Sequence, residues 1–252
     1  MRDTPPLPET RRRSSQPAAS ASSVAETIAD PTALGTSQNG AVFIVTSSGL
    51  RGRCSGTAVQ AGNRSVVVTA GHCVHDFGHW LSGRWVFVPG YRYGQRPLGT
   101  FAAEWLGTTP QWKKSENGNF DVGMAVVSRN EEGRRLDSVV EPDKIAWGLS
   151  RRQTFDVYGY PVAEPFDGAT LQRCPQTPYE GHDFLSFLTT GPLDLAIECN
   201  VTPGSSGGGW VIHGDTLNGV TSSGYSDNPA TTYGPYFGAA VGRLYREAER
   251  AK

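Results

Sequence analysis

The segment Thr202-Pro203-Gly204-Ser205-Ser206-Gly207-Gly208-Gly209 sets a serine among glycines in the last quarter of a 252-residue chain. Glycine has no Cβ, so backbone amides in such a segment can approach a bound group closely. A serine hydroxyl is a poor nucleophile unless a base takes its proton, and that base needs a partner that fixes its tautomer. The segment makes Ser206 a candidate nucleophile, for which the chain must supply both groups.

Two upstream segments supply candidates for the base and its partner. The run Val66-Val67-Val68-Thr69-Ala70-Gly71-His72-Cys73 reads as a strand that ends in a histidine. The run Asn119-Phe120-Asp121-Val122-Gly123-Met124-Ala125-Val126-Val127 sets an aspartate before an apolar strand. The order His72, Asp121, Ser206, together with the surroundings of each residue, resembles the chymotrypsin-like serine proteases.

Single motifs permit other interpretations. Residues 204–208 also satisfy the G-x-S-x-G nucleophile elbow of α/β-hydrolases, but that fold places its acid and its histidine after the serine. The one histidine after Ser206 is His213, only seven residues away, and the remaining chain is too short for the strands and helices of that fold. A metal cluster of His72, Cys73, His75 and His79 fits no ligand spacing typical of zinc sites. We expect no metal and no cofactor.

From about residue 40 the chain alternates short β-rich runs with turn residues, which predicts an all-β fold of the barrel or sandwich type. The expected strands are 41–46, 56–60, 65–69, 84–88, 121–127, 154–159, 185–188, 193–197, 209–213, 217–222 and 236–240. The resemblance implies two packed six-stranded antiparallel β-barrels, His72 and Asp121 from the first and Ser206 from the second. A short C-terminal helix is expected over 241–252.

Three regions follow from this interpretation. Residues 1–36 are rich in Ser, Ala, Pro, Thr and Arg and are expected to form a disordered tail or pro-segment. Residues 37–130 would form the N-terminal barrel, and residues 131–252 the C-terminal barrel with the helix. The crossover between the barrels is expected near residues 130–150.

Composition restricts the partners. The formal net charge is −1, which gives no argument for nucleic acid or an anionic membrane, and no apolar run approaches membrane-spanning length. We therefore expect a soluble monomer that acts on a peptide or protein substrate.

Four cysteines can pair in three ways, and the residues alone do not choose among them. The resemblance implies Cys54 with Cys73, closing the histidine loop, and Cys174 with Cys199. Disulfides indicate an oxidising compartment, so we expect a secreted protein. Residues 1–30 show no apolar stretch of the length that a signal peptide needs, so the route of export stays open.

The resemblance also implies which groups meet the substrate. The backbone amides of Gly204 and Ser206 would form the oxyanion hole. Substrate-binding positions are expected at Asn200, Val201, Ser222, Ser223 and Gly224. No aspartate stands near Asn200, so a preference for Lys or Arg is not supported, and residues 221–224 lack the histidine that many glutamate-specific relatives have there.

Ser205 replaces the acid, and Gly209 the proline, of the animal-enzyme pattern Gly-Asp-Ser-Gly-Gly-Pro. Together with Tyr158-Gly159-Tyr160-Pro161, this favours bacterial trypsin-like and glutamyl-endopeptidase-like enzymes as the closer resemblance. The function expected is a serine endopeptidase that works through an acyl-enzyme. Two alternatives remain: a catalytically silent binding or adhesion module of the same fold, and an esterase that uses the same three residues.

Overall fold

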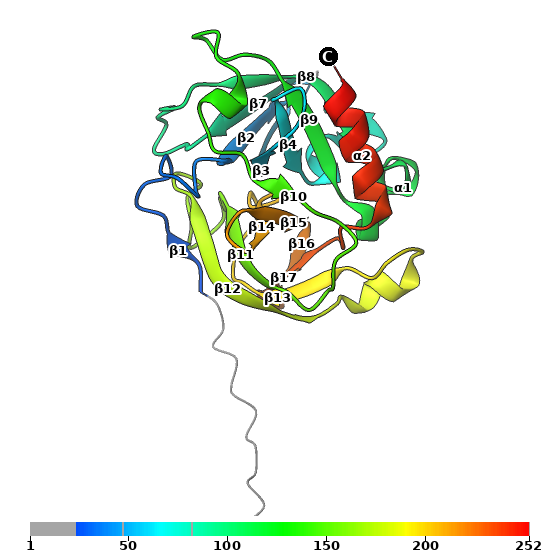
Figure 1. Cartoon of the computed structure of the whole chain (residues 1–252). Coiled ribbons are helices and arrows are strands. Elements are labelled where there is room, and N and C mark those ends of the chain that lie inside the picture. Colours follow the sequence, from blue (N-terminus) through cyan, green and yellow to red (C-terminus); the bar gives the residue numbers. More distant parts are fainter. Residues whose placement is uncertain (1–23, 47, 82, 252) are drawn as a thin grey trace, which may run out of the picture.

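The computed structural model describes residues 24–46, 48–81 and 83–251, and consists mainly of β-strands in two packed units (Figure 1). This confirms the all-β prediction and the two-barrel architecture. The predicted tail over residues 1–23 lies outside the described residues. None of the described helices is long and apolar enough to cross a membrane.

The first unit is a closed six-stranded barrel in the order β2-β3-β4-β9-β8-β7, and all its pairs are antiparallel. Side chains alternate between two faces along each strand, so Val67 packs inside this barrel while Val66 and Val68 face the core shared with the second unit. The strands are β2 (Asn39–Val45), β3 (Arg51–Val59), β4 (Val66–Thr69), β7 (Arg84–Pro89), β8 (Phe101–Thr108) and β9 (Gly123–Val127). A small hairpin, β5 (His75–Asp76) and β6 (His79–Trp80), follows the histidine turn.

The second unit is built on the path β10-β15-β14-β11-β12-β13-β17-β16, and β1 pairs with β12. Six of these strands, from β15 to β17, curve round a core that contains Phe155, Ile197 and Trp210. The path is not closed by a strand ladder, but Ser222 N–H donates to the Tyr233 carbonyl across the gap (2.9 Å). The bounds are β1 (Glu26–Thr27), β10 (Lys144–Ile145), β11 (Thr154–Gly159), β12 (Gln172–Gly181), β13 (Leu195–Glu198), β14 (Gly209–Ile212), β15 (Thr216–Val220), β16 (Ser223–Tyr225) and β17 (Asn228–Gly234).

Helical segments are short, except at the C-terminus. They are η1 (Gly71–Cys73), α1 (Pro110–Ser115), η2 (Gly118–Phe120), η3 (Leu136–Ser138), η4 (Phe184–Leu188) and α2 (Ala239–Arg250). Although α2 follows the second barrel in sequence, it packs on β8 and β9 of the first (Figure 1). Its buried side chains include Val241, Leu244 and Ala248, which join the core shared by the two barrels.

Several sequence predictions were wrong in detail. The run 185–188 forms η4 rather than a strand, because the Asp183 side chain caps its first turn. Residues 236–240 form a loop and the start of α2. Strands β8, β12 and β17 were missed, and β12 contains two prolines, which cannot donate to a ladder.

The disordered tail predicted over residues 1–36 differs from the structure from residue 24 onwards. Residues 24–28 lie along the second barrel, and residues 29–32 lie beside Gly90 and Arg92 of the first. Strand β1 pairs with β12, and Ile28 N–H donates to the Leu171 carbonyl (2.9 Å). Composition alone does not predict this placement, because it depends on backbone pairing with β12 and on only two partly buried apolar side chains, Ala25 and Ile28.

Candidate active site

The pairing of β4 with β9 brings His72 and Asp121 together. Strand β4 ends at Thr69, opposite Gly123 of β9, so the turn after one strand meets the turn before the other. His72 Nδ1 lies 2.8 Å from Asp121 Oδ2, and the His72 backbone N–H donates to Oδ1 of the same carboxylate (2.8 Å). Ser222 Oγ donates to Asp121 Oδ2 (2.6 Å). The buried carboxylate thus fixes both the imidazole ring and the turn that carries it.

The same contacts set the protonation of His72. Burial disfavours the charged imidazolium, but the charge and hydrogen bond of Asp121, with a smaller contribution from Asp76, outweigh burial and raise the pKa of His72 above 6.5. A carboxylate at Nδ1 favours the tautomer whose Nε2 is free to accept a proton. His72 is therefore suited to act as a general base.

Ser206 lies in a tight loop that joins β13 to β14. Gly204 and Gly207 have backbone φ angles of +98° and +80°, which residues with a side chain rarely adopt. A Cβ on Gly207 would stand 2.1 Å from Thr69 Oγ1, and one on Gly204 would stand 2.8 Å from the Tyr160 carbonyl oxygen. The glycines around Ser206 are therefore required by the conformation of the loop and by its close approach to Thr69 of the first barrel and to Tyr160 after β11 of the second.

Buried Ser55, on β3 of the first barrel, makes hydrogen bonds that fix the loop carrying Ser206. Its hydroxyl donates to the Gly204 carbonyl (2.9 Å) and accepts from Tyr160 N–H (2.8 Å), and its backbone N–H donates to the Ser206 carbonyl (2.7 Å). Cys73 Sγ lies 3.7 Å from that carbonyl oxygen. Ser206 is thereby fixed beside the turn that carries His72.

Three polar groups of this loop have no hydrogen-bond partner in the described part of the chain: the backbone N–H groups of Gly204 and Ser206, and the Ser206 hydroxyl. The neighbouring amides of Ser205, Gly207 and Gly208 are all bonded within the protein. Free amides beside a free hydroxyl leave donors available for an acyl oxygen next to a nucleophile.

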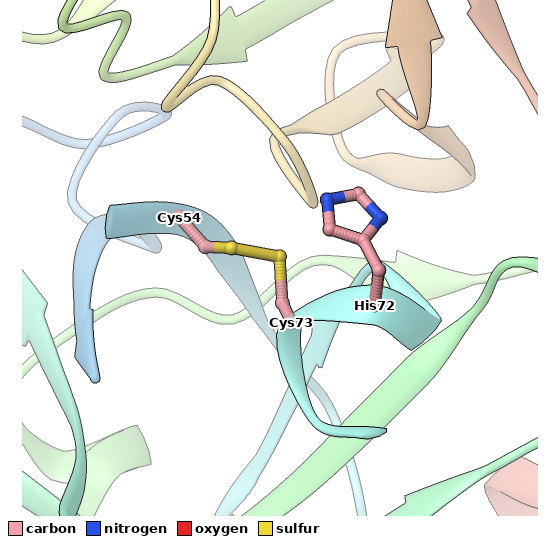
Figure 2. Close-up of side chains that lie close together, drawn as sticks. All are labelled: Cys54, His72 and Cys73. Carbon is pink, nitrogen blue, oxygen red and sulfur yellow. A yellow bond between two sulfur atoms is a disulfide. The ribbon is translucent and has the colours of Figure 1, made fainter. Parts of the chain in front are cut away.

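Disulfides join Cys54 to Cys73 (S–S 2.01 Å) and Cys174 to Cys199 (2.24 Å), which are the pairs that the resemblance implies. Figure 2 shows His72 and Cys73 leaving the same turn, with Cys73 reaching to Cys54 while the His72 ring extends away from the turn. The ligand atoms of these three residues lie within 4.8 Å of one another, but both sulfurs are disulfide-bonded and are not thiolate ligands. His75 packs instead against Trp80, with ring centroids 5.0 Å apart.

A hollow of about 680 Å³ opens beside Ser206, which we call the Ser206 pocket. Four of the five predicted substrate-binding residues line it: Val201, Ser222, Ser223 and Gly224. The fifth, Asn200, is not among its lining residues, and its amide oxygen accepts from Ala25 N–H (2.8 Å). Asn200 therefore holds the N-terminal segment in place, which the sequence interpretation did not foresee.

A second hollow, of about 340 Å³, opens on the side of His72, and we call it the His72 pocket. Most of its lining is not predicted from the sequence, because it comes from segments far apart in the chain: Trp112, Asn119, Asp183, Leu185, Ser186, Asp194 and Tyr225. Ser222, Ser223 and Tyr225 line both pockets and form their common edge. The apolar run of η4 was a signal for this region, but it was assigned to a strand.

The arrangement defines a two-barrel hydrolase with serine, histidine and aspartate at the junction of the barrels. Among solved structures, the chain is similar to the protease Anisep from Arthrobacter nicotinovorans, with 32% identity over 88% of this chain and 99% of that one and a TM-score of 0.80. It is also similar to the thermostable serine protease AL20 from an extremophilic microorganism, with 34% identity over 86% and 98% of the two chains and a TM-score of 0.78. A Glu endopeptidase structure shares the fold at 16% identity and a TM-score of 0.68, covering 90% of this chain and 97% of that one.

The chain therefore belongs to the chymotrypsin-like serine proteases, a family of endopeptidases. No protein-family model matches it. A curated protein, the extracellular metalloprotease of Bacillus subtilis (strain 168), is 33% identical over 70 residues, which are 28% of this chain and 21% of that protein.

Proposed function

We propose that this chain is a serine endopeptidase in which Ser206 attacks the peptide carbonyl. His72 takes the proton of the hydroxyl and passes it to the leaving amine, while Asp121 orients the ring and stabilises the imidazolium. An acyl-enzyme forms on Ser206 Oγ, and water hydrolyses it with His72 again as base. The observation that carries this proposal is the bond between His72 Nδ1 and Asp121 Oδ2 (2.8 Å), in a turn next to the Ser206 loop, whose serine hydroxyl has no partner among the described residues.

The backbone amides of Gly204 and Ser206 are proposed as the oxyanion hole. Both lack an acceptor among the described residues, although each flanks amides that have one. Donors held in place without a partner stabilise a developing oxyanion without reorganising first, and each is typically worth about 3 to 4 kcal/mol.

The substrate is proposed to be a polypeptide that enters as an extended strand along Ser222-Ser223-Gly224. The side chain of the scissile residue would lie in the Ser206 pocket, against Val201. Two disulfides fit an extracellular protein, so we propose that the enzyme is secreted. We also propose that it acts as a monomer, because residues of this one chain supply the whole candidate site.

Fluorophosphonate labelling of the purified protein, followed by mass spectrometry of the modified peptide, tests the proposal. We expect one label per chain on Ser206, lost in His72→Ala and Ser206→Ala and kept in Ser115→Ala, which alters an exposed serine on α1. Cleavage of casein should be lost in the same variants. Absence of labelling in a folded protein would favour the silent binding module, and labelling with ester but no peptide hydrolysis would favour the esterase.

A further inference from the structure

Four large apolar side chains are exposed on one short element. Phe184, Leu185, Phe187 and Leu188 of η4 have 74%, 50%, 58% and 71% of their surface accessible, and we call these four side chains the η4 rim. Single exposed apolar residues are ordinary, but a contiguous set on a soluble protein marks a surface that binds something.

The η4 rim is held in place, so its exposure does not come from a loose loop. Asp183 caps the turn by accepting from Leu185 N–H (3.1 Å). The Ser186 hydroxyl is buried and donates to Asn119 Oδ1 (2.5 Å), and Asn119 Nδ2 donates back to the Ser186 carbonyl (3.0 Å). The polar residue at the centre of η4 faces inward, and the apolar ones face outward.

The rim is continuous with the candidate active site. Leu185 and Ser186 line the His72 pocket together with His72, Asp121 and Tyr225. Leu185 is half exposed and is one of the side chains that line this hollow. A chain bound beside His72 would therefore reach the rim without leaving the cleft.

We propose that the η4 rim binds apolar side chains of the polypeptide substrate on the N-terminal side of the scissile bond, with Leu185 and Phe187 as specificity-determining residues. This inference rests on the proposed function and names its preferred substrates. Successive side chains of an extended peptide point to opposite faces. Because Ser222 and Ser223 separate the two pockets, a peptide along this edge sends one side chain into the Ser206 pocket and the next towards the His72 pocket and the rim.

The charges near the η4 rim indicate which kind of partner binds there. The His72 pocket contains the carboxylates of Asp183 and Asp194, and residues 182–194 include no Lys or Arg. An anionic lipid surface would meet these carboxylates, and the Arg151 guanidinium beside Asp194 is already bonded to the Leu193 and Asp194 carbonyls. Acidic substrate side chains would be repelled in the same way, so an uncharged apolar stretch of polypeptide suits the surface best.

Binding of fluorescent peptides to the Ser206→Ala protein, followed by anisotropy, tests the proposal without any need for turnover. Two peptides share one scissile residue, chosen from a short-ester panel, and carry either Leu or Ser at the second and fourth positions before the scissile bond. We expect the Leu peptide to bind about ten-fold more tightly. The preference should fall below about two-fold when Leu185→Ser and Phe187→Ser are added, and should persist with Leu34→Ser, an exposed leucine outside both pockets.

Each other outcome would overturn the proposal. A Leu preference that survives in the rim variant, or its absence in the Ser206→Ala protein, removes the rim from substrate recognition. Sedimentation with phosphatidylglycerol vesicles that depends on Leu185 and Phe187, without peptide discrimination, would assign the rim to a membrane. A dimer that the rim variant abolishes would assign it to a second copy. The single variant Phe187→Ser repeats the test if the combined variant unfolds. Hydrolysis of the short ester by the unaltered protein is measured separately, and its failure would count against the proposed function alone.

Discussion

Among single residues, Asp76 changes the pKa of His72 through its charge and not through a hydrogen bond. Its charge adds to that of Asp121 in raising the pKa of His72 above 6.5. Because His72 accepts a proton only when neutral, kcat/KM should fall as the pH drops below that pKa. We predict that Asp76→Asn shifts this acid limb to lower pH, because the variant removes a charge that favours the imidazolium. Rates for a short ester between pH 5 and 9 measure the shift, and an unmoved limb would show that Asp76 has no electrostatic role.

Asp143 is a second residue whose charge state matters, and it lines neither of the two pockets. Its Oδ1 accepts from Gln38 Nε2 (2.9 Å), while Asp143 Oδ2 and Gln38 Oε1 are both buried acceptors without a partner in the described part of the chain. One proton on Oδ2 would satisfy both atoms, since the acid could then donate to the amide oxygen. Burial, opposed by the Gln38 bond and assisted by the charges of Asp215 and Glu141, raises the pKa of Asp143 to about 7.

The raised pKa of Asp143 makes the free energy of unfolding depend on pH. Between the unfolded value of 3.8 and about 7, the folded protein binds the Asp143 proton and the unfolded chain does not. The contribution of Asp143 is therefore complete below pH 4 and is lost as the pH rises to about 7, with a slope approaching about 1.4 kcal/mol per pH unit. Asp215, whose pKa its bond to Lys144 lowers below 3.8, and Tyr158, whose pKa burial raises to about 12, do not change their charge over this range.

Asp143→Asn tests the assignment, because the new amide can donate to Gln38 Oε1 at every pH. Urea unfolding from pH 4.5 to 8 should show a smaller loss of stability with rising pH in the variant than in the unaltered protein. Parallel curves for the two proteins would mean that Asp143 is ionised throughout and that its unpaired oxygen has another explanation.

At the scale of elements, the turn before β9 is tied to η4 across the boundary between the barrels. Asn119, two residues before Asp121, bonds to Ser186 and to Thr189 Oγ1 (2.8 Å), and Asn117 Nδ2 donates to the Thr190 carbonyl (2.9 Å). These bonds connect the turn that positions Asp121 to the rim that we assign to substrate.

Removal of this connection should affect chemistry and not only binding. We predict that Asn119→Ala lowers kcat for a short ester about ten-fold, because a small displacement of Asp121 misorients His72. It should also cost about 1 to 3 kcal/mol of stability, since buried Ser186 loses its partner. Ser115→Ala, on the exposed end of α1, serves as the control. A variant with normal kcat and reduced stability would show that the connection is structural only.

Elements that their own residues specify could be predicted from the sequence, whereas elements that depend on neighbouring strands could not. The strands that carry His72 and Asp121 were predicted because apolar runs of β-branched residues identify buried strands without further context. Strand β12, with its prolines and polar residues, was missed because its neighbours β11 and β13 determine it. Of the site, the glycine loop and the histidine turn could be predicted from short motifs. Asp183, Leu185 and Asp194 could not, because folding alone brings them near His72.

At the scale of the whole molecule, the two barrels share one core. That core contains Val66 and Met124 from the first barrel and Tyr158 and Val211 from the second, and Leu244 of α2 packs into it. The groups that we propose as catalytic are divided between the same two barrels, so the geometry of the site depends on how firmly this core joins them.

The C-terminal helix is the part of this junction that can be tested most directly. It leaves the second barrel, packs on the first, and is anchored there by Tyr245 Oη, which donates to the Gln60 carbonyl (2.7 Å), and by Asn63 Nδ2, which donates to the Ala248 carbonyl (2.8 Å). Truncating a buried leucine typically costs about 2 to 5 kcal/mol, and we predict such a loss for Leu244→Ala, with Glu247→Ala on the exposed face as control.

Because the core is shared, the loss of stability in Leu244→Ala should destabilise both barrels together. In hydrogen exchange read by mass spectrometry, peptides from β9 and from β14 should lose protection by the same factor in Leu244→Ala, and chemical unfolding should stay a single transition. If β9 is loosened while β14 keeps its protection, the barrels unfold separately. Alignment of Ser206 with His72 would then depend on the local bonds of Ser55 rather than on the common core.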